Sequence, residues 1–289
     1  MRYAFIKAHR DEFAVKLMAN VLKVSVSGFY GWLKRLKSKR AQEDEVLTEK
    51  IIMFHCGSRC TYGSPRIHKD LIAAGHELGR KRVARLMKAA GIRGKSKRKF
   101  KTTTNSKHKR PKADNLVKQN FSTPAPDTLW ASDITYIATA EGWLYLAVIL
   151  DLYSRKVIGW AFSDRLNDEL TLAALEMAVQ QRPDLAGRIH HSDQGVQYAS
   201  HSFQAKLEIA NIQQSMSGKG NCYDNAVVES FFASLKTEEV DDAHYETRQQ
   251  AKTSLFSYIE GFYNSKRRHS SLNYLSPDEF ERLYFANVA

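Results

Sequence analysis

The sequence predicts an α/β protein in which helices flank a mixed sheet of five strands, preceded by small all-helical, helix-turn-helix-like domains. Three observations lead to this fold class. As far as residue 92, apolar residues recur at helical spacing between short turns. From Leu129 onward, strand-like apolar runs alternate with helical ones. Between these parts, residues 93–118 contain eleven Lys or Arg and a single acid, which marks a domain boundary.

Residues 1–56 are predicted to form an N-terminal helical region. Phe13, Leu17 and Val21 make a stripe that is expected to face a core. Ser25 is a candidate N-cap for the helix that follows a short break. Two helices joined by a short turn, with a basic end, fit a helix-turn-helix. The same pattern fits a packed helical hairpin equally well.

Residues 57–92 are predicted to form a second helical module, which has the stronger case for DNA binding. Pro65 suits the first turn of one helix, and Gly91 suits the end of the next. That second helix is crowded with basic residues, and its candidate nucleic-acid contacts are Arg80, Arg82 and Arg85. A solvated basic surface helix is the alternative.

Residues 93–125 are predicted to form a basic flexible linker. The segment has almost no apolar periodicity, so it buries too little surface to order itself, and its cations repel one another. Against DNA such a segment would follow the phosphates and make binding strongly salt-dependent. A linker that only improves solubility is the alternative.

Residues 126–240 are predicted to form the α/β core, and residues 241–289 a helical extension. The order expected within the core is three strands (129–138, 143–150 and 155–163), a helix (167–181), a strand that delivers Asp193, a helix (200–209), a strand (211–215) and a last helix from 225 onward. This is the element order of a ribonuclease-H-like fold.

Three acids lie at notable positions, and at one of them, inside an apolar run, an ionised side chain would be energetically costly. Asp133 lies inside a strand-like run, Asp193 follows the end of another, and Glu229 projects from the last helix of the core. A carboxylate within an apolar run needs a partner, and a divalent cation is the usual one. Three carboxylates that converge at the sheet would bind two Mg²⁺ ions, an arrangement used for in-line attack at a phosphodiester. Taken singly, each acid also fits a capped loop or a surface helix.

Three motifs resemble a known family: Trp130-x-x-Asp133-Ile134-Thr135-Tyr136, His191-Ser192-Asp193-Gln194-Gly195 and Asp224-Asn225-Ala226-x-x-Glu229-Ser230. The gap between the second and third acids is 35 residues, and a lysine follows the glutamate by seven. Together these features resemble the integrase core of DD35E insertion-sequence transposases over most of residues 120–285. The similarity is to the second-reading-frame, OrfB-type product of two-frame elements, whose catalytic domain resembles retroviral integrases.

The resemblance implies a DNA transposase, a polynucleotidyl transferase that cleaves element ends and joins their 3′ ends to target DNA. It implies that the catalytic and metal-binding residues are Asp133, Asp193 and Glu229, with two Mg²⁺ ions for which Mn²⁺ can substitute. Lys236 would contact phosphate near the scissile bond, and Asn225 would contact DNA or orient a ligand.

A basic cluster in the helical extension adds further candidates for phosphate contact, namely Lys266, Arg267 and Arg268. A basic helix end that complements the helix dipole is the alternative. The partners expected from the resemblance are double-stranded DNA, further copies of the chain on that DNA, and the first-reading-frame protein of the same element, to which such products are often joined by frameshifting.

The net charge of +13 over 289 residues favours a polyanionic partner. Three cysteines argue for a reducing compartment, and the spacing of Cys56 and Cys60 from nearby histidines does not fit paired zinc ligands. The apolar runs are too short to span a bilayer. A cytoplasmic, nucleoid-associated bacterial protein is therefore expected.

Two other classes of function remain open from the sequence. One is a DNA-binding regulator with an inactive core, against which the presence of all three acids argues. The other is a ribonuclease-H-type nuclease, against which the paired helical modules and the basic segment argue.

Overall fold

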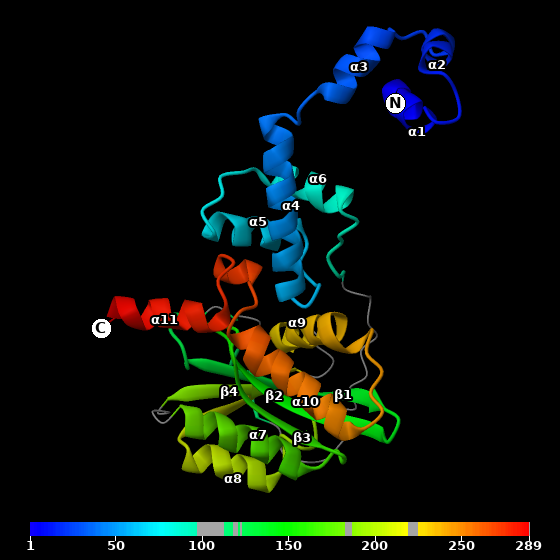
Figure 1. Ribbon diagram of the computed structural model, residues 1–289. Helices are drawn as coiled ribbons and strands as arrows, with labels where there is room; N and C mark the ends of the chain where they lie inside the picture. The colour runs from blue at the N-terminus through cyan, green and yellow to red at the C-terminus, as the bar shows by residue number, and fades with distance from the viewer. Residues whose placement is uncertain (97–112, 118–120, 122, 183–186, 219–224, 289) are drawn as a thin grey trace. The chain divides into compact units, whose positions relative to one another are not determined.

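The computed structural model describes residues 1–96, 113–117, 121, 123–182, 187–218 and 225–288 (Figure 1). The chain divides into two compact units, residues 1–52 and 53–289. The division falls within helix α4 (Lys39–Gly57). Within the described residues no helix is both long and apolar enough to cross a membrane.

The first unit contains three short helices before α4, namely α1 (Arg2–Ala8), α2 (Val15–Val21) and α3 (Val26–Lys34). The predicted cap of α3 is confirmed, because the Ser25 hydroxyl accepts a hydrogen bond from the backbone N–H of Gly28 at 2.8 Å. The buried cluster of this unit consists of Ile6, Met18, Ala19 and Phe29.

The predicted apolar stripe of the first unit is wrong. Phe13, Leu17 and Val21 are 53%, 58% and 72% exposed. Phe13 lies before α2 begins, so it is not part of the helical repeat. Within α2 the residues that turn inward are Met18 and Ala19, which shifts the buried face by about one position from the predicted one.

The second unit begins with the helical module predicted from the sequence. Helix α5 (Ser64–Ala73) starts after an N-cap at Gly63, with a proline in its first turn, and α6 (Arg80–Ala89) ends before Gly91 at a φ of +72°. The buried residues of the two helices are Ile67, Leu71, Val83, Leu86 and Met87. The apolar face of α6 is therefore inside, and its basic residues lie outward.

The core of the second unit is a sheet of five strands in the order β3-β2-β1-β4-β5. The strands are β1 (Leu129–Thr139), β2 (Gly142–Asp151), β3 (Val157–Ser163), β4 (Arg188–Ser192) and β5 (Ile212–Met216). β1, β2 and β3 pair antiparallel, whereas β1, β4 and β5 pair parallel. The predicted mixed sheet and the order of its elements are confirmed.

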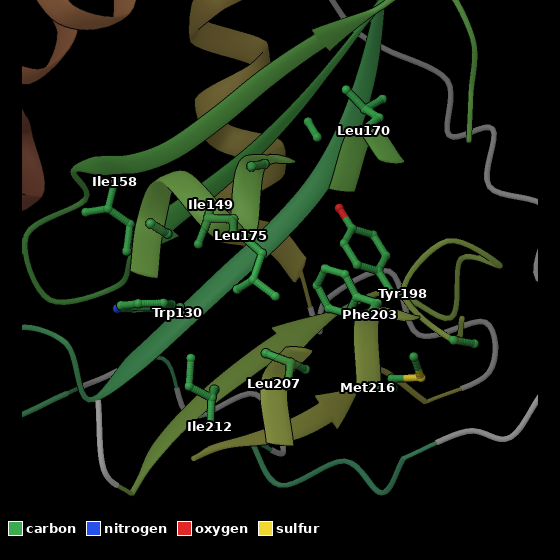
Figure 2. Close-up of a cluster of buried hydrophobic side chains, with 14 residues drawn as sticks. Trp130, Ile149, Ile158, Leu170, Leu175, Tyr198, Phe203, Leu207, Ile212 and Met216 are labelled. Carbon is green, nitrogen blue, oxygen red and sulfur yellow. The ribbon is translucent and has the colours of Figure 1, made fainter. Parts of the chain in front are cut away.

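Helices α7 (Asp168–Gln181) and α8 (His201–Ile209) cover one face of the sheet, and α9 (Ala226–Leu235) and α10 (Arg248–Tyr258) the other (Figure 1). Figure 2 shows the buried cluster on the α7 and α8 side, where Trp130, Phe203 and Leu175 are among the packed side chains. Gly159 in β3 permits this packing, because a Cβ there would lie 2.3 Å from the carbonyl oxygen of Ala174.

Both α9 and α10 continue directly into further helical turns. A π-helical segment, η2 (Lys236–Val240), continues directly from α9, and a second, η3 (Ile259–Asn264), continues from α10. A short 3₁₀ turn, η4 (Ser270–Leu272), and helix α11 (Pro277–Val288) complete the chain. Glu281 of α11 accepts two hydrogen bonds from Arg182 after α7, at 2.7 and 2.8 Å, which ties the C-terminal helix to the core.

Both ends of the predicted flexible linker are held by the folded unit, which corrects that part of the prediction. Near its start, the backbone N–H of Lys95 donates to the carbonyl oxygen of Thr61 at 3.0 Å. Near its end, the N–H of Leu116 donates to Ser215 Oγ in β5 at 3.0 Å, and Val117 is only 6% exposed. Residues 97–112, which hold most of the cations, lie outside the described part of the chain.

Candidate active site

The pairing of β1 with β4 brings the first two predicted acids side by side. In this parallel pair Ser132 lies opposite Ser192, so the next residues, Asp133 and Asp193, follow at the same level of the sheet. Asp133 is still within β1, whereas Asp193 begins the loop after β4. Both side chains are half-buried. Residues 60 positions apart in sequence thus meet because two parallel strands align.

The loop after β4 fixes the orientation of the second acid. Asp193 Oδ1 accepts a hydrogen bond from the backbone N–H of Gly195 at 2.9 Å. A Cβ at Gly195 would lie 2.9 Å from that same oxygen, so a larger residue there would displace the Asp193 carboxylate. Gln194 Nε2 donates to the carbonyl oxygen of Ser217 at 2.9 Å, which joins the loop to the end of β5.

Asn225 anchors the start of α9 to β1. Its side-chain Nδ2 donates to the carbonyl oxygen of Ser132 at 3.2 Å, directly before Asp133. Glu229 lies one turn further along α9 and is exposed. Asn225 is only 7% exposed, and its hydrogen bond to β1 holds the start of the helix that carries Glu229. The contact of Asn225 with DNA or with a ligand stays a prediction.

Crowding of negative charge is the main electrostatic property of this region. Burial raises the pKa of Asp133 well above its ordinary value, and the charges of Asp193 and Glu229 raise it further. A hydrogen bond from the backbone N–H of Ile134, at 2.7 Å, and the charge of Lys236 act in the opposite direction. Burial also raises the pKa of Glu229. The region therefore favours a cation or a proton.

The donor set fits a hard divalent cation. Asp133 and Asp193 supply carboxylate oxygens, which Mg²⁺ and Mn²⁺ prefer, and they lie next to each other on firm backbone. Among the described residues no group of three His, Cys, Asp or Glu side chains is already close enough to hold a metal ion. The charge of Glu229 raises the pKa of Asp133 less than the charge of Asp193 does.

Lys236, the predicted phosphate contact, lies beside the acids at the start of η2. It is close enough to Asp133 to lower the pKa of that carboxyl. Its Nζ also lies 5.0 Å from the ring centroid of Tyr136, three residues after Asp133 in β1.

A buried tyrosine below the acids was missed by the sequence analysis. Tyr198 is 2% exposed, and its pKa is raised well above 10.0 by burial and by the charges of Asp133 and Asp193. Its backbone carbonyl accepts a hydrogen bond from Gln214 Nε2 at 2.7 Å. An aromatic residue three positions after Gly195 was visible in the sequence, but nothing there indicated that it would lie below both carboxylates.

Three other polar residues near the site have structural roles. Neither His190 nor His191 is exposed, and His191 Nδ1 is 2.9 Å from Ser215 Oγ. Burial lowers the pKa of His190 to about 3, so this ring is neutral within the core. Asp151 accepts hydrogen bonds from the N–H and hydroxyl of Ser154, at 2.9 and 2.7 Å, as a turn-forming residue does.

Two of the three basic residues in the C-terminal cluster are not available as predicted. Arg267 is 2% exposed and donates to Glu238 at 2.7 and 2.5 Å, and Arg268 donates to Asp70 of α5 at 2.5 Å. Their guanidinium groups neutralise carboxylates of the same unit, so the phosphate contact predicted for them is wrong. Lys266 is exposed, and its contact stays a prediction.

On α6 the predicted DNA contacts lie at the surface. Arg80 and Arg85 are exposed and Arg82 is half-buried. Cys56 and Cys60 are exposed free thiols. The third cysteine, Cys222, lies outside the described residues, as does Asp224 of the third motif.

Comparison with protein families identifies two kinds of domain in the chain. Residues 123–222 and 210–277 match integrase core domain models, and residues 41–100 match an HTH-like domain. Asp133 and Asp193 lie within the first match and Glu229 within the second. The HTH-like match begins within the region predicted as 1–56 and includes α5 and α6.

Two curated relatives match over nearly the whole chain. The transposase InsF for insertion sequence IS3A of Escherichia coli K12 is 43% identical over 283 residues, which are 97% of this chain and 98% of the relative. An uncharacterized 31 kDa protein of insertion element IS600 of Shigella sonnei is 45% identical over 272 residues, which are 94% of this chain and all of the relative.

Two retroviral structures match part of the chain at low similarity. A simian T-cell lymphotropic virus intasome structure matches 80% of this chain and 74% of its own, with a TM-score of 0.46 and 16% identity. The HTLV-2 integrase catalytic core domain in complex with magnesium matches 55% of this chain and 99% of its own, with a TM-score of 0.42 and 16% identity. From its extended identity to the InsF transposase and its integrase core, the chain belongs to the IS3 family of insertion-sequence transposases.

Proposed function

We propose that this chain cuts the ends of an insertion sequence and joins the resulting 3′ ends to target DNA. The observation that carries the proposal is the alignment of Asp133 with Asp193 on paired parallel strands, beside the helix that carries Glu229. Parallel strand pairing aligns the first two acids, and the Asn225 anchor holds the helix that bears the third. A like-charged group of this kind is costly to keep unless it binds a cation.

The proposed catalytic and metal-binding residues are Asp133, Asp193 and Glu229. Two Mg²⁺ ions, or Mn²⁺ in their place, would supply activation of a water or 3′-hydroxyl nucleophile and stabilisation of the leaving oxygen. Asp133 and Asp193 contribute their oxygens from fixed backbone, whereas Glu229 completes the set by a change of side-chain rotamer. Asn225 keeps α9 beside β1 so that this small movement suffices.

Lys236 has a separate part in the proposal. Its ammonium group lies on the α9 side of Asp133, where it would hold a phosphate oxygen near the scissile bond. A lysine suits this role because it acts as a point charge and does not need a fixed bidentate geometry.

The DNA partner is proposed to be duplex DNA at the element ends and the target. Arg80, Arg82 and Arg85 on α6 would contact its backbone, together with Lys266 and the basic segment 93–125. Further copies of the chain on the DNA, and the first-reading-frame protein of the same element, are proposed as protein partners. The setting proposed for these reactions is the bacterial cytoplasm, in association with the nucleoid.

The proposed organisation has five parts: a helical region (1–56), a DNA-binding module (57–92), a basic connecting segment (93–125), a catalytic core (126–240) and a helical extension (241–289). The match to an HTH-like domain supports the position of the second part, although that match starts earlier, at residue 41.

The experiment that tests the proposal is incubation of the chain with labelled element-end duplex, target DNA and Mg²⁺. Products longer than the input strand, whose sequenced junctions carry the 3′ end of the element, are expected. The same reaction with a fusion to the first-reading-frame protein tests whether that partner is needed. DNA binding without joined product in either form would favour a regulator with an inactive core. Cleavage of an RNA–DNA hybrid without joining would favour a ribonuclease-H-type nuclease.

A further inference from the structure

Two large aromatic side chains are exposed on the sheet next to the candidate active site. Tyr136 of β1 is 43% exposed and Trp143 of β2 is 50% exposed. Their ring centroids are 4.9 Å apart, with the rings nearly perpendicular at 80°. They lie on the antiparallel pair β1 and β2, where Tyr136 is opposite Tyr145 and Trp143 is opposite Ala138. We call Tyr136 and Trp143 the aromatic pair.

Cations flank the aromatic pair. The Lys236 ammonium lies 5.0 Å from the centre of the Tyr136 ring. The Arg248 guanidinium donates from Nε to the backbone carbonyl of Trp143 at 3.0 Å. Exposed rings with cations nearby are typical of surfaces that bind single-stranded nucleic acid, where bases stack on the rings and phosphates approach the cations.

The aromatic pair is within reach of the scissile phosphate, if the acids act as proposed. Tyr136 follows Asp133 by three residues, about 10 Å along β1, and the two side chains leave the strand on opposite faces because strand side chains alternate. That distance equals about three nucleotides of one DNA strand at ~3.4 Å each. Lys236 connects the two places, because it lies near the Tyr136 ring and interacts electrostatically with Asp133.

We propose that the aromatic pair binds a base of the DNA that has left the double helix, within about three nucleotides of the cleaved 3′ end. In the absence of DNA, the Lys236 ammonium group lies over the Tyr136 ring. When the DNA strand binds, the ammonium group leaves the ring and contacts a phosphate. A cation over an exposed ring is worth only about 0.5–1 kcal/mol, so the exchange is easy. The location of the base rests on the proposed function, whereas the stacking itself does not.

The test uses end duplexes in which 2-aminopurine replaces each of the last three bases of the 3′ strand in turn. The full chain is added in metal-free buffer, so that binding is measured without reaction. Stacking on the aromatic pair is expected to quench the fluorescence at one of the three positions. Trp143→Ala and Tyr136→Ala are expected to abolish that quenching and to weaken binding by about 5- to 150-fold.

Matched variants separate stacking from other effects. Trp143→Phe and Tyr136→Phe keep a ring and should keep the quenching. Phe285→Ala removes an equally exposed ring from α11 (50% exposed) and should leave quenching and affinity unchanged. Equal quenching by wild type and Trp143→Ala would overturn the inference. So would a loss of self-association in Trp143→Ala without DNA, since the rings would then be a contact between copies of the chain.

Base stacking on the aromatic pair and strand transfer can fail independently, and the two failures give different results. If quenching depends on the aromatic pair but the wild type joins no DNA in Mg²⁺, the stacking surface holds and the strand-transfer activity fails. If the wild type joins DNA and Trp143→Ala neither loses quenching nor binds more weakly, the activity holds and the stacking surface fails.

Discussion

Two acids of the second unit, Glu238 and Asp133, have pKa values that are shifted in opposite directions. Glu238 is 7% exposed and accepts hydrogen bonds from Arg267, at 2.7 and 2.5 Å, and from the Tyr258 hydroxyl at 2.8 Å. Burial alone would raise its pKa, but these partners outweigh burial and lower it. Asp133 is surrounded instead by Asp193 and Glu229, and the one cation acting on it, Lys236, has the smallest effect among the causes of its shifted pKa.

The contrast is sharp because one acid of each kind lies on the same continuous helical stretch. Glu229 lies on α9 and Glu238 on η2, which follows α9 directly. An acid that meets an arginine holds parts of the fold together, as Glu238 does and as Asp70 does with Arg268. Acids that meet each other weaken the fold, and the chain gains from them only when a cation arrives.

The largest expected effect comes from removing one charge of the acid group. Asp133→Asn, Asp193→Asn or Glu229→Gln should each lower the rate of 3′-end joining by about a thousandfold or more, since metal-ion stabilisation of the transition state is worth several kcal/mol. Quantified joining of labelled end DNA measures the effect. Asp164→Asn, which changes an exposed acid, serves as control and should join at the wild-type rate. Substantial joining by Asp133→Asn would remove that residue from the site.

The next largest effect is expected on stability, from removing the arginine that pairs with Glu238. Arg267→Ala leaves the buried Glu238 carboxylate without its main partner and should lower the free energy of unfolding by about 3–5 kcal/mol. Urea unfolding followed by circular dichroism measures the loss. The neighbouring Lys266→Ala should change stability by less than about 0.5 kcal/mol, because Lys266 is exposed. Equal effects of the two substitutions would refute the distinction between a buried pair and a surface cation.

The two kinds of acid should also differ in the pH dependence of stability. The pKa of Asp133 is raised in the fold, so the metal-free folded state binds a proton more tightly than the unfolded state does, and stability falls as pH rises through the folded pKa. Asp133→Asn should therefore stabilise the metal-free protein at neutral pH. The pKa of Glu238 is lowered, so its contribution is present above its ordinary value of 4.5 and is lost as pH falls through the folded pKa.

Unfolding free energies measured from pH 3 to 8 for wild type, Asp133→Asn and Glu238→Gln check these signs. Addition of Mg²⁺ at a hundred times its Kd should stabilise the wild type by about 2.7 kcal/mol and Asp133→Asn by much less. A destabilised Asp133→Asn in metal-free buffer at neutral pH would mean that the carboxylate has a structural partner after all.

The smallest effect is expected at the anchor of α9. Asn225→Ala removes the hydrogen bond to the Ser132 carbonyl and should cost about 1 kcal/mol of stability. Joining should slow through kcat, with KM for DNA little changed, because Glu229 then samples more orientations. Steady-state joining over a range of DNA concentrations separates the two constants. A rise in KM alone would indicate instead that Asn225 contacts DNA.

The sheet and the acids could be predicted because their signals are local. Strand-like runs bounded by turns defined β1 to β5, and Asp133 was conspicuous because a carboxylate is costly inside such a run. That Asp133 and Asp193 would meet followed only from the resemblance, since strand pairing cannot be read from either strand alone. The Asn225 anchor depends on the same long-range alignment.

The basic residues were harder to place, because their partners are distant in the chain. Arg267 pairs with an acid 29 residues away and Arg268 with one 198 residues away. In sequence both look like surface cations beside Lys266. The stripe around Leu17 failed for a related reason, since helices of seven residues are too short for periodicity to fix their buried face.

Binding of Mn²⁺ to the chain in complex with end DNA, followed by electron paramagnetic resonance, shows whether the three acids hold metal ions. We expect two bound ions per chain in the wild type and markedly weaker binding in Asp133→Asn, Asp193→Asn and Glu229→Gln. Glu238→Gln that remains folded should bind as the wild type does. Two ions bound equally well by Asp133→Asn, or none bound by a wild-type complex that joins DNA, would contradict the assignment of the three acids as metal ligands.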